Sequence, residues 1–207
     1  MKKLNYEILG SGSSGNCVII EDMMVDIGLP YKRIKEKLYE IKYILITHRH
    51  TDHVNRNTVK KIKENFPRIK IIGNYDVCDL IKIDYPVGDE TEIILKDRVV
   101  QSFKCVHDVP CSGYVIDYKE LNLIYATDTA NLEYAPKGKY DYFFIESNHD
   151  EKKVEAIRNT TYKKYGYNAY AGAKRHLSTQ QSQLFYFLNR KDKESKWIEL
   201  HKSKRFY

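Results

Sequence analysis

The segment THRHTDHV, residues 47–54, constrains this chain more than any other. It directly follows the apolar run YILI, and within six residues it holds His48, His50, Asp52 and His53. The apolar run predicts a buried strand, and alternate residues of an extended chain face the same side. His48 and His50 can therefore reach one metal ion, whereas Asp52 and His53, where the chain turns, can face a second. Nitrogen and oxygen donors suit Zn²⁺, Mn²⁺ or Fe²⁺ rather than a structural thiolate zinc site.

The order of the other elements predicts an α/β fold. Alternating or apolar runs bounded by turn residues predict strands at 4–9, 17–21, 23–27, 43–47, 69–73, 91–95, 99–106, 113–118, 122–128, 140–146 and 196–200. Helical spacing and cap signals predict helices at 30–41, 57–66, 74–82 and 178–189. The last begins at Ser178 with Gln181 three residues on, as in a capping box. Helices that fall between blocks of strands indicate a layered α/β sandwich.

Size and composition predict one globular domain that spans residues 1–207, of which 42% are apolar and 30% charged. No run approaches the roughly 18 apolar residues of a membrane span, and the first dozen residues lack the apolar centre of a signal peptide. We therefore expect no membrane partner and a cytoplasmic location, and the oligomeric state stays open. The four cysteines form no CxxC pair and are expected to be buried and reduced: Cys17, Cys78, Cys105 and Cys111.

The net charge of +7 is unevenly distributed. From Glu151 to Tyr207 there are 14 Lys and Arg against 5 Asp and Glu, whereas the preceding 150 residues hold 21 against 23. A basic C-terminal quarter favours an anionic partner, with nucleic acid as the first candidate. A solvated basic surface that aids solubility explains the charge equally well.

The motif HRHTDH resembles the signature of the metallo-β-lactamase fold hydrolases, whose fold is an αββα four-layer sandwich with a metal site at one edge. The motifs LGSGSSGNC, ESNHD and RHLS narrow the resemblance to WalJ/YycJ-like proteins, which are regarded as DNA-processing nucleases. The tRNA 3′-processing endonucleases are more distant relatives. The resemblance extends from Leu4 to about Ser203.

This resemblance implies ligands for two divalent ions, zinc or manganese. One ion would be held by His48, His50 and His107, and the other by Asp52, His53 and His201, with Asp128 between them. Two ions about 4 Å apart can deprotonate a water molecule at neutral pH, and Asp52 is placed to orient that water. The surroundings of His201, LHKS, depart from the HLS of the family.

The resemblance also implies an acid for the leaving group. Glu146 in ESNHD would orient His176 in RHLS, which would protonate the leaving oxygen. The carboxylate would also raise the pKa of the imidazole. His176 could instead replace His201 as a metal ligand. His149 is either a substrate contact or a loop residue.

Residues 158–176 interleave tyrosines with basic residues and lead into His176. Tyrosines can stack on unpaired bases while basic side chains follow the phosphates. A loop that merely covers the protein is the alternative. The basic side chains expected to bind substrate are Lys163, Lys164, Lys174 and Arg175, and the tyrosines are Tyr162, Tyr165, Tyr167 and Tyr170.

The sequence thus predicts a dinuclear metal-dependent phosphodiesterase that acts on nucleic acid, as a DNA exonuclease. An RNA-processing nuclease or a cyclic nucleotide phosphodiesterase would need the same metal site, because the fold does not fix the substrate. Thioester or lactam hydrolysis is less favoured, since it needs no Glu/His pair. A non-catalytic DNA-binding module is also less favoured, because structural metal sites are usually closed and rich in thiolates.

Overall fold

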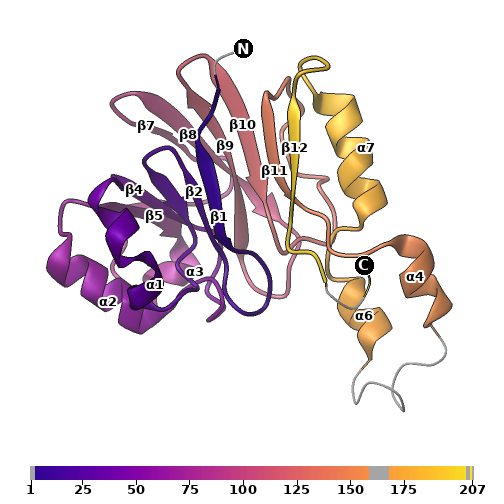
Figure 1. The fold of residues 1–207 in the computed structure, drawn as a ribbon, viewed down its shortest axis with the longest axis horizontal. Coiled ribbons are helices and arrows are strands. Elements are labelled where there is room, and N and C mark those ends of the chain that lie inside the picture. Colours follow the sequence, from indigo (N-terminus) through magenta and orange to yellow (C-terminus); the bar gives the residue numbers. More distant parts are fainter. Residues whose placement is uncertain (1–2, 159–167, 204–205, 207) are drawn as a thin grey trace.

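The computed structural model describes residues 3–158, 168–203 and 206. In the described residues, two six-stranded sheets face each other (Figure 1). The first sheet follows the chain, with β1 to β3 antiparallel and β3 to β6 parallel. Its strands are β1 (Tyr6–Gly10), β2 (Cys17–Ile20), β3 (Met23–Val25), β4 (Tyr43–Ile46), β5 (Lys70–Asn74) and β6 (Tyr85–Val87).

The second sheet has the order β12-β11-β10-β9-β8-β7. Strands β7 to β10 form an antiparallel meander, and β10, β11 and β12 run parallel. Its strands are β7 (Glu92–Ile94), β8 (Arg98–Cys105), β9 (Cys111–Tyr118), β10 (Leu121–Ala126), β11 (Tyr142–Glu146) and β12 (Lys196–Leu200).

Helices cover both outer faces of the sheet pair. The first sheet carries α1 (Tyr31–Ile34), the 3₁₀ helix η1 (Lys35–Tyr39) and α2 (Arg56–Asn65), and the second carries α7 (Thr179–Asn189) (Figure 1). Short helices α3 (Tyr75–Cys78), α4 (Glu151–Ala156) and α6 (Ala169–Ala173) lie beyond strand ends. The result is an αββα four-layer sandwich, as the family resemblance implies.

The alternation of side chains along the strands explains these layers. In β2, Val18 and Ile20 belong to the apolar core between the sheets, whereas Cys17 and Ile19 pack toward the helices of the first outer layer. In the second sheet, Phe143 packs under α7 while Phe144 lies in the core between the sheets. Each sheet is therefore apolar on both faces, so it needs a covering layer on each.

Most elements agree with the sequence prediction, and the differences are local. The helix expected at 30–41 is a single α-turn followed by a 3₁₀ helix, and α2 begins after Asn55, whose side chain accepts from the Thr58 amide. Sequence patterns missed β6, α4 and α6, which are each six residues or fewer. The capping box of Ser178 and Gln181 is confirmed. Cys78 is exposed, contrary to expectation; the other three cysteines are buried, and all four are free.

None of the helices in the described part of the chain has the length and apolarity that crossing a membrane requires.

One edge of the sandwich collects the ends of several strands. Strands β8, β10, β11 and β12 run in the same direction, so their carboxyl ends meet at this edge. The segment after β4 in the first sheet reaches the same place, because the Thr47 carbonyl accepts a hydrogen bond from the Ser112 amide at 2.9 Å. The polar residues that follow these strands are therefore brought together.

Candidate metal centre

Three histidines from two distant parts of the sequence converge at this edge. The His50 Nδ1 atom is 3.0 Å from His48 Nε2 and 3.4 Å from His107 Nε2. His48 and His50 follow β4, and His107 follows β8, so the two sheets contribute jointly. Burial lowers the pKa of His48 and of His107. The rings of His48 and His107 are therefore held in the neutral form that binds metal ions. Three imidazole nitrogens this close together are a set that can hold one metal ion.

A second group of donors lies beside the first. His53 Nε2 is 2.8 Å from Asp128 Oδ2 and 3.8 Å from Asp52 Oδ2. His48 joins His53 and Asp128 in a cluster whose donor atoms lie within metal-binding distance of one another. The Asp128 carboxylate is buried, and the charged neighbour of its Oδ2 atom among the described residues is the His53 ring. A buried carboxylate among imidazoles fits a divalent cation, because such a charge is costly unless it is offset.

Asp26 and Thr47 fix the orientation of these imidazoles, and sequence reasoning missed both. The fully buried Asp26 accepts from the Thr47 amide and hydroxyl at 2.8 and 3.0 Å, and its other oxygen is 2.7 Å from His53 Nδ1. The Thr47 hydroxyl is also 3.0 Å from His48 Nδ1. Such outer partners set which ring nitrogen faces a metal. The only signal in the sequence is a carboxylate within the apolar run MMVDI.

The charge around His53 follows from its two neighbouring carboxylates. Burial by itself would lower the pKa of His53, but Asp26 and Asp128 raise it to about 10. Burial would raise the pKa of Asp128, yet its bond to His53 and the charge of His201 hold it well below the usual range. His53 and Asp128 therefore form an ion pair, and a metal cation can take the place of the proton between them.

The loop between β1 and β2 closes the second group from one side. Asn16, only 1% exposed, places its Nδ2 atom 2.7 Å from His53 Nε2 and 3.4 Å from Asp52 Oδ2. Its backbone amide donates to the Asp52 carbonyl at 2.7 Å, and its carbonyl accepts from the Gly28 amide at 2.9 Å. This part of the SGSSGN motif thus supports Asp52 and His53.

Glu146 joins two further histidines to the site. Its Oε1 atom is 2.8 Å from His176 Nδ1 and 2.6 Å from His201 Nδ1, and its Oε2 atom accepts from the amides of Thr129 and Leu177. Both rings also lie 3.4 Å from Asp128 Oδ1. Burial would lower the pKa of both imidazoles, but Glu146 raises that of His176, and that of His201 reaches about 9. His176 and His201 are therefore equally close to Asp128, so the distances do not choose between them as the last metal ligand.

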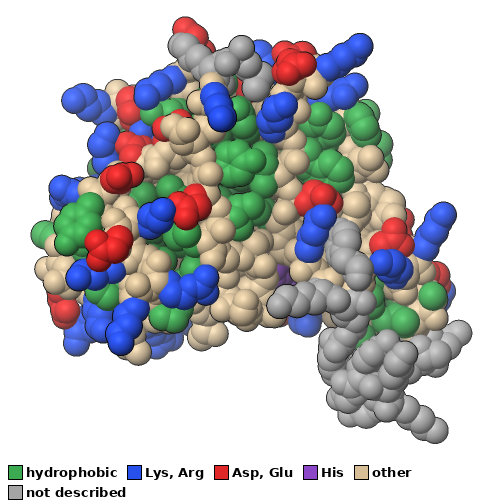
Figure 2. All heavy atoms as spheres, in the orientation of Figure 1, with side chains coloured by type: hydrophobic (Ala, Val, Ile, Leu, Met, Phe, Trp, Pro, Cys, Tyr) green, Lys and Arg blue, Asp and Glu red, His purple; other side chains and the backbone are tan. Residues whose placement is uncertain are grey.

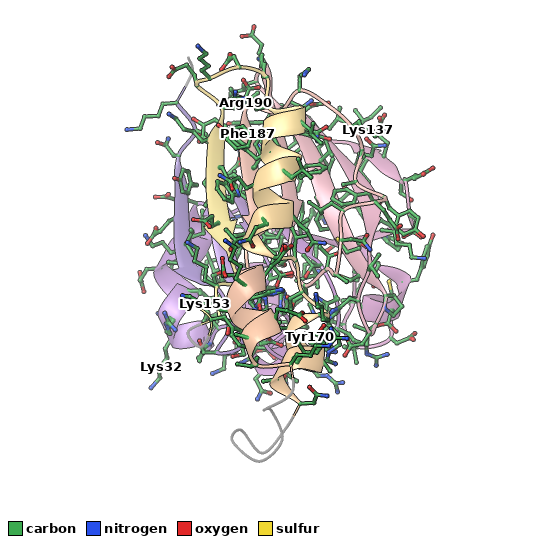
Figure 3. All side chains as sticks on the ribbon, turned by 90° about the vertical axis from the view of Figure 1, so that its right-hand side faces the viewer. Lys32, Lys137, Lys153, Tyr170, Phe187 and Arg190 are labelled. Carbon is green, nitrogen blue, oxygen red and sulfur yellow. The ribbon has the colours of Figure 1, made fainter. Side chains whose placement is uncertain are left out.

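The residues expected to bind substrate are placed very differently. Lys163 and Lys164 lie outside the described residues, as do Tyr162, Tyr165 and Tyr167. Arg175 is exposed and pairs with Asp108 at 3.2 Å, next to His176. Lys174 is exposed, with its Nζ atom 5.6 Å from the ring centroid of Tyr170 on α6 (Figure 3).

His149 does not reach the surface. Its side chain is 2% exposed and its backbone pairs with that of Ser178. Burial lowers the pKa of its imidazole. A direct contact with substrate would therefore require this part of the chain to open. The sequence left two interpretations of His149, a substrate contact or a loop residue, and its burial agrees better with the loop residue.

A second basic surface lies on the opposite side of the site edge. Residues 31–68 hold 11 Lys and Arg against 4 Asp and Glu, and Figure 2 shows basic side chains gathered over α1 and α2. Sequence analysis assigned the excess charge to the C-terminal quarter alone, because summing over 150 residues hid this local concentration. Lys60 and Arg56, one helical turn apart, are exposed on α2, which begins just after the His53 segment.

Comparisons with known proteins agree with this architecture. Human tRNase Z, short form, matches with a TM-score of 0.70 over 97% of this chain and 93% of that chain, at 17% identity. The metallo-β-lactamase fold protein YhfI from Bacillus subtilis matches with a TM-score of 0.68 over 96% of this chain and 86% of that one, at 14% identity. The chain therefore has the metallo-β-lactamase fold.

Within this class, the resemblance that the motifs predict is confirmed. The chain is 29% identical to the exodeoxyribonuclease WalJ of Streptococcus pneumoniae serotype 2 (strain D39), and the alignment covers 76% of this chain. This chain spans 66% of the length of that relative. No family model matches the chain.

Proposed function

We propose that this chain is a metal-dependent phosphodiesterase that hydrolyses DNA from strand ends. The observation that carries the proposal is the convergence of imidazole and carboxylate donors from both sheets at one edge of a metallo-β-lactamase fold. Its similarity to an exodeoxyribonuclease supports DNA as the substrate. Because residues of both sheets share one core, we also propose that residues 1–207 act as one domain.

Two divalent ions, zinc or manganese, would occupy the donor groups. His48, His50 and His107 would hold one; Asp52, His53 and His201 would hold the other, with Asp128 between them. When bound, such ions activate water and offset negative charge on a phosphodiester. Asp26 and Thr47 would keep the imidazoles of His48 and His53 turned toward the ions.

The side chains near Glu146 would supply the proton to the leaving group. Glu146 holds His176 by a 2.8 Å contact and raises its pKa, which favours the protonated imidazole. His176 is partly exposed at the site edge and is therefore the proton donor that we assign to the leaving oxygen. Asp52, whose side chain is 28% exposed, belongs to the donor group of His53 and would orient the attacking water from that side of the site.

Basic surfaces on both sides of the site edge suit a polyanion. Arg175 and Lys174 lie on the α6 side, and the exposed lysines and arginines of α2 lie on the other. We expect the strand to pass between them and to be held through its phosphates, so that affinity falls with added salt. RNA is the second candidate substrate, because the fold is shared with human tRNase Z.

The test is cleavage of end-labelled single- and double-stranded DNA and RNA in Mn²⁺, Zn²⁺ or chelator, alongside cyclic nucleotides. Stepwise, metal-dependent loss from one DNA end is the expected result. Turnover of cyclic nucleotides with intact polymers would overturn the substrate and leave the metal chemistry standing. No hydrolysis of any phosphodiester with either metal would overturn the proposal.

A further inference from the structure

Two cavities adjoin the donor groups from different sides. His176 and His201 line a cavity of about 470 Å³ beneath the β1–β2 loop, which we call the serine-lined cavity because Ser11, Ser13 and Ser14 contribute to it. His107 lines a cavity of about 670 Å³ that includes Asp76, Asp89 and Asp108, which we call the aspartate-lined cavity. The two meet at the mouth of the site, where Arg175 of the first lining pairs with Asp108 of the second at 3.2 Å.

The charges of the two linings have opposite sign. Arg175 and Lys202 line the serine-lined cavity, and no carboxylate does so among the described residues. The aspartate-lined cavity contains three carboxylates and Lys104, whose Nζ atom lies over the ring of Tyr134, 5.1 Å from its centroid. A phosphate that enters the first cavity meets cations and hydroxyls, whereas one that enters the second meets carboxylates.

Of the two linings, as far as the structure describes them, that of the aspartate-lined cavity alone contains an exposed aromatic ring. Tyr75, the first residue of α3, is 65% exposed. Its ring packs near Gly88, where an added Cβ would lie 3.7 Å from Tyr75 Cε2. A ring held against the wall and open on its other face is suited to stack on a nucleobase.

We infer that the terminal nucleoside of the strand binds in the aspartate-lined cavity, with its base on Tyr75, and that the rest of the strand leaves across the serine-lined cavity. The inference rests on the proposed function and adds the chemistry of the strand end. In a polynucleotide, every nucleoside inside the strand carries a phosphate on both sides, whereas the terminal nucleoside carries one only on the side of the scissile bond. The carboxylates of the cavity repel a second phosphate. The nucleoside that suits this cavity is therefore a terminal one whose free end is a hydroxyl.

Asp89 is the carboxylate that discriminates between ends. Asp76 is paired with Arg49 at 2.8 Å, and Asp108 is paired with Arg175, so both charges are partly offset. Asp89 is exposed and has no ion-pair partner in the described part of the chain. A terminal phosphate in this cavity would face Asp89 without a compensating cation.

The experiment uses the full chain with Mn²⁺ and DNA oligonucleotides that carry a hydroxyl or a phosphate at each end. A phosphate on the attacked end is expected to slow the first cleavage about tenfold. In Asp89→Lys, the two ends are expected to differ by less than about threefold. Tyr75→Ala is expected to raise KM about tenfold with kcat unchanged within about twofold, and Tyr75→Phe to behave as the unaltered chain.

Matched controls are Glu90→Lys, which makes the same charge change outside the cavity lining, and Tyr39→Ala, which removes an exposed tyrosine elsewhere. Both should leave end preference and KM unchanged. If phosphorylated ends are cut as fast as or faster than hydroxyl ends, or if Tyr75→Ala leaves KM unchanged, the inference is overturned while the nuclease activity stands. If neither the oligonucleotides nor bis(p-nitrophenyl) phosphate is hydrolysed, the proposed function fails, and the inference with it.

Discussion

At the scale of single residues, Glu146 shows how one buried side chain sets the charge of two others. It is fully buried, yet all its acceptor capacity is used: one oxygen contacts His176 and His201, and the other accepts two backbone amides. Burial would raise the pKa of Glu146, but the two imidazoles lower it. The carboxylate therefore stays ionised and favours the protonated form of both imidazoles.

This arrangement makes His176 testable apart from the metal ligands. We expect His176→Gln to lower kcat about 100-fold or more while the metal content per chain stays unchanged. Metal analysis by atomic absorption and steady-state kinetics provide the two readouts. Loss of about one metal ion per chain would show that His176 is a ligand instead, the alternative that the sequence left open.

Asp52 gives the complementary prediction. We expect Asp52→Ala to lower cleavage by about a thousandfold or more, because a ligand and the group that orients water are lost together. Its side chain is partly exposed, so without metal the variant should have nearly the same Tm as the metal-free unaltered chain, as judged by circular dichroism. Asp79→Ala, at an exposed position, is the control and should retain full activity. Cleavage by Asp52→Ala at a near-normal rate with metal bound would contradict the assignment.

At the scale of elements, the loops after the strands hold the site by close backbone contact. A Cβ atom at Gly28 would lie 1.7 Å from the carbonyl oxygen of Asp52, so only glycine fits between β3 and the His53 segment. Asp26, Asp128 and His201 adopt φ values of 62°, 53° and 53°, a left-handed conformation that is costly for residues other than glycine. Each follows a strand and turns its side chain at the site edge, where such strain is commonly found.

The close contact at Gly28 predicts the effect of a single methyl group. We expect Gly28→Ala to lower the free energy of unfolding by about 3 kcal/mol, since backbone must move to admit the Cβ. Urea denaturation followed by circular dichroism measures it. Gly88→Ala is the control, because its Cβ would meet its nearest neighbours at 3.6 and 3.7 Å, an ordinary contact. Equal stability of the two variants would show that the Asp52 loop yields easily.

A second prediction concerns the ion pair that joins α2 to the segment before β6. Burial would raise the pKa of Asp84, but the Lys63 ammonium at 2.6 Å and the Ile71 amide lower it. Because the folded pKa is depressed, the stabilisation is present above the unfolded pKa of about 3.9 and disappears as the pH falls below it.

We expect Asp84→Asn to lose up to about 1 kcal/mol at pH 7, because the pair is partly exposed, and the difference to shrink as the pH falls below about 3.9. Urea midpoints at a series of pH values measure this. Asp79→Asn should run parallel to the unaltered chain. A constant deficit at all pH values would assign the effect to packing instead of charge.

The sequence predicted strands and long helices better than the short elements. Apolar runs identified every strand except β6, because both faces of each sheet are covered. They could not reveal α4 and α6, since helices of five or six residues have fewer than two turns. Histidines in a dense motif were easy to select, whereas Asp26 and Asn16 act through contacts with residues more than 20 positions away, which no local pattern contains. The depth at which His149 is buried was equally invisible.

At the scale of the whole molecule, the donor groups connect the two sheets. His48, His50 and His53 follow a strand of the first sheet, whereas His107, Asp128 and His201 follow strands of the second. An ion bound by both groups would tie the halves of the sandwich together, and ligand binding to the folded state alone increases stability.

Metal removal is therefore expected to lower Tm by about 10 °C, and return of Zn²⁺ or Mn²⁺ to restore it. Differential scanning calorimetry with chelator, and then with excess metal, measures the change. Asp52→Ala should show a smaller shift, because one ligand is missing. An unchanged Tm on complete removal of metal would show that the sheets need no such connection.

The spread of the donors along the chain also has a consequence for biosynthesis. The first of them, His48, leaves the ribosome more than 150 residues before His201, and the strand that positions each one must first find its place in a sheet. A nascent chain thus exposes an incomplete set of imidazoles during most of its synthesis. We expect correct metal loading to be a late event that follows synthesis of His201 and the pairing of β12 with its sheet, with the choice of ion governed by what the cell offers at that moment.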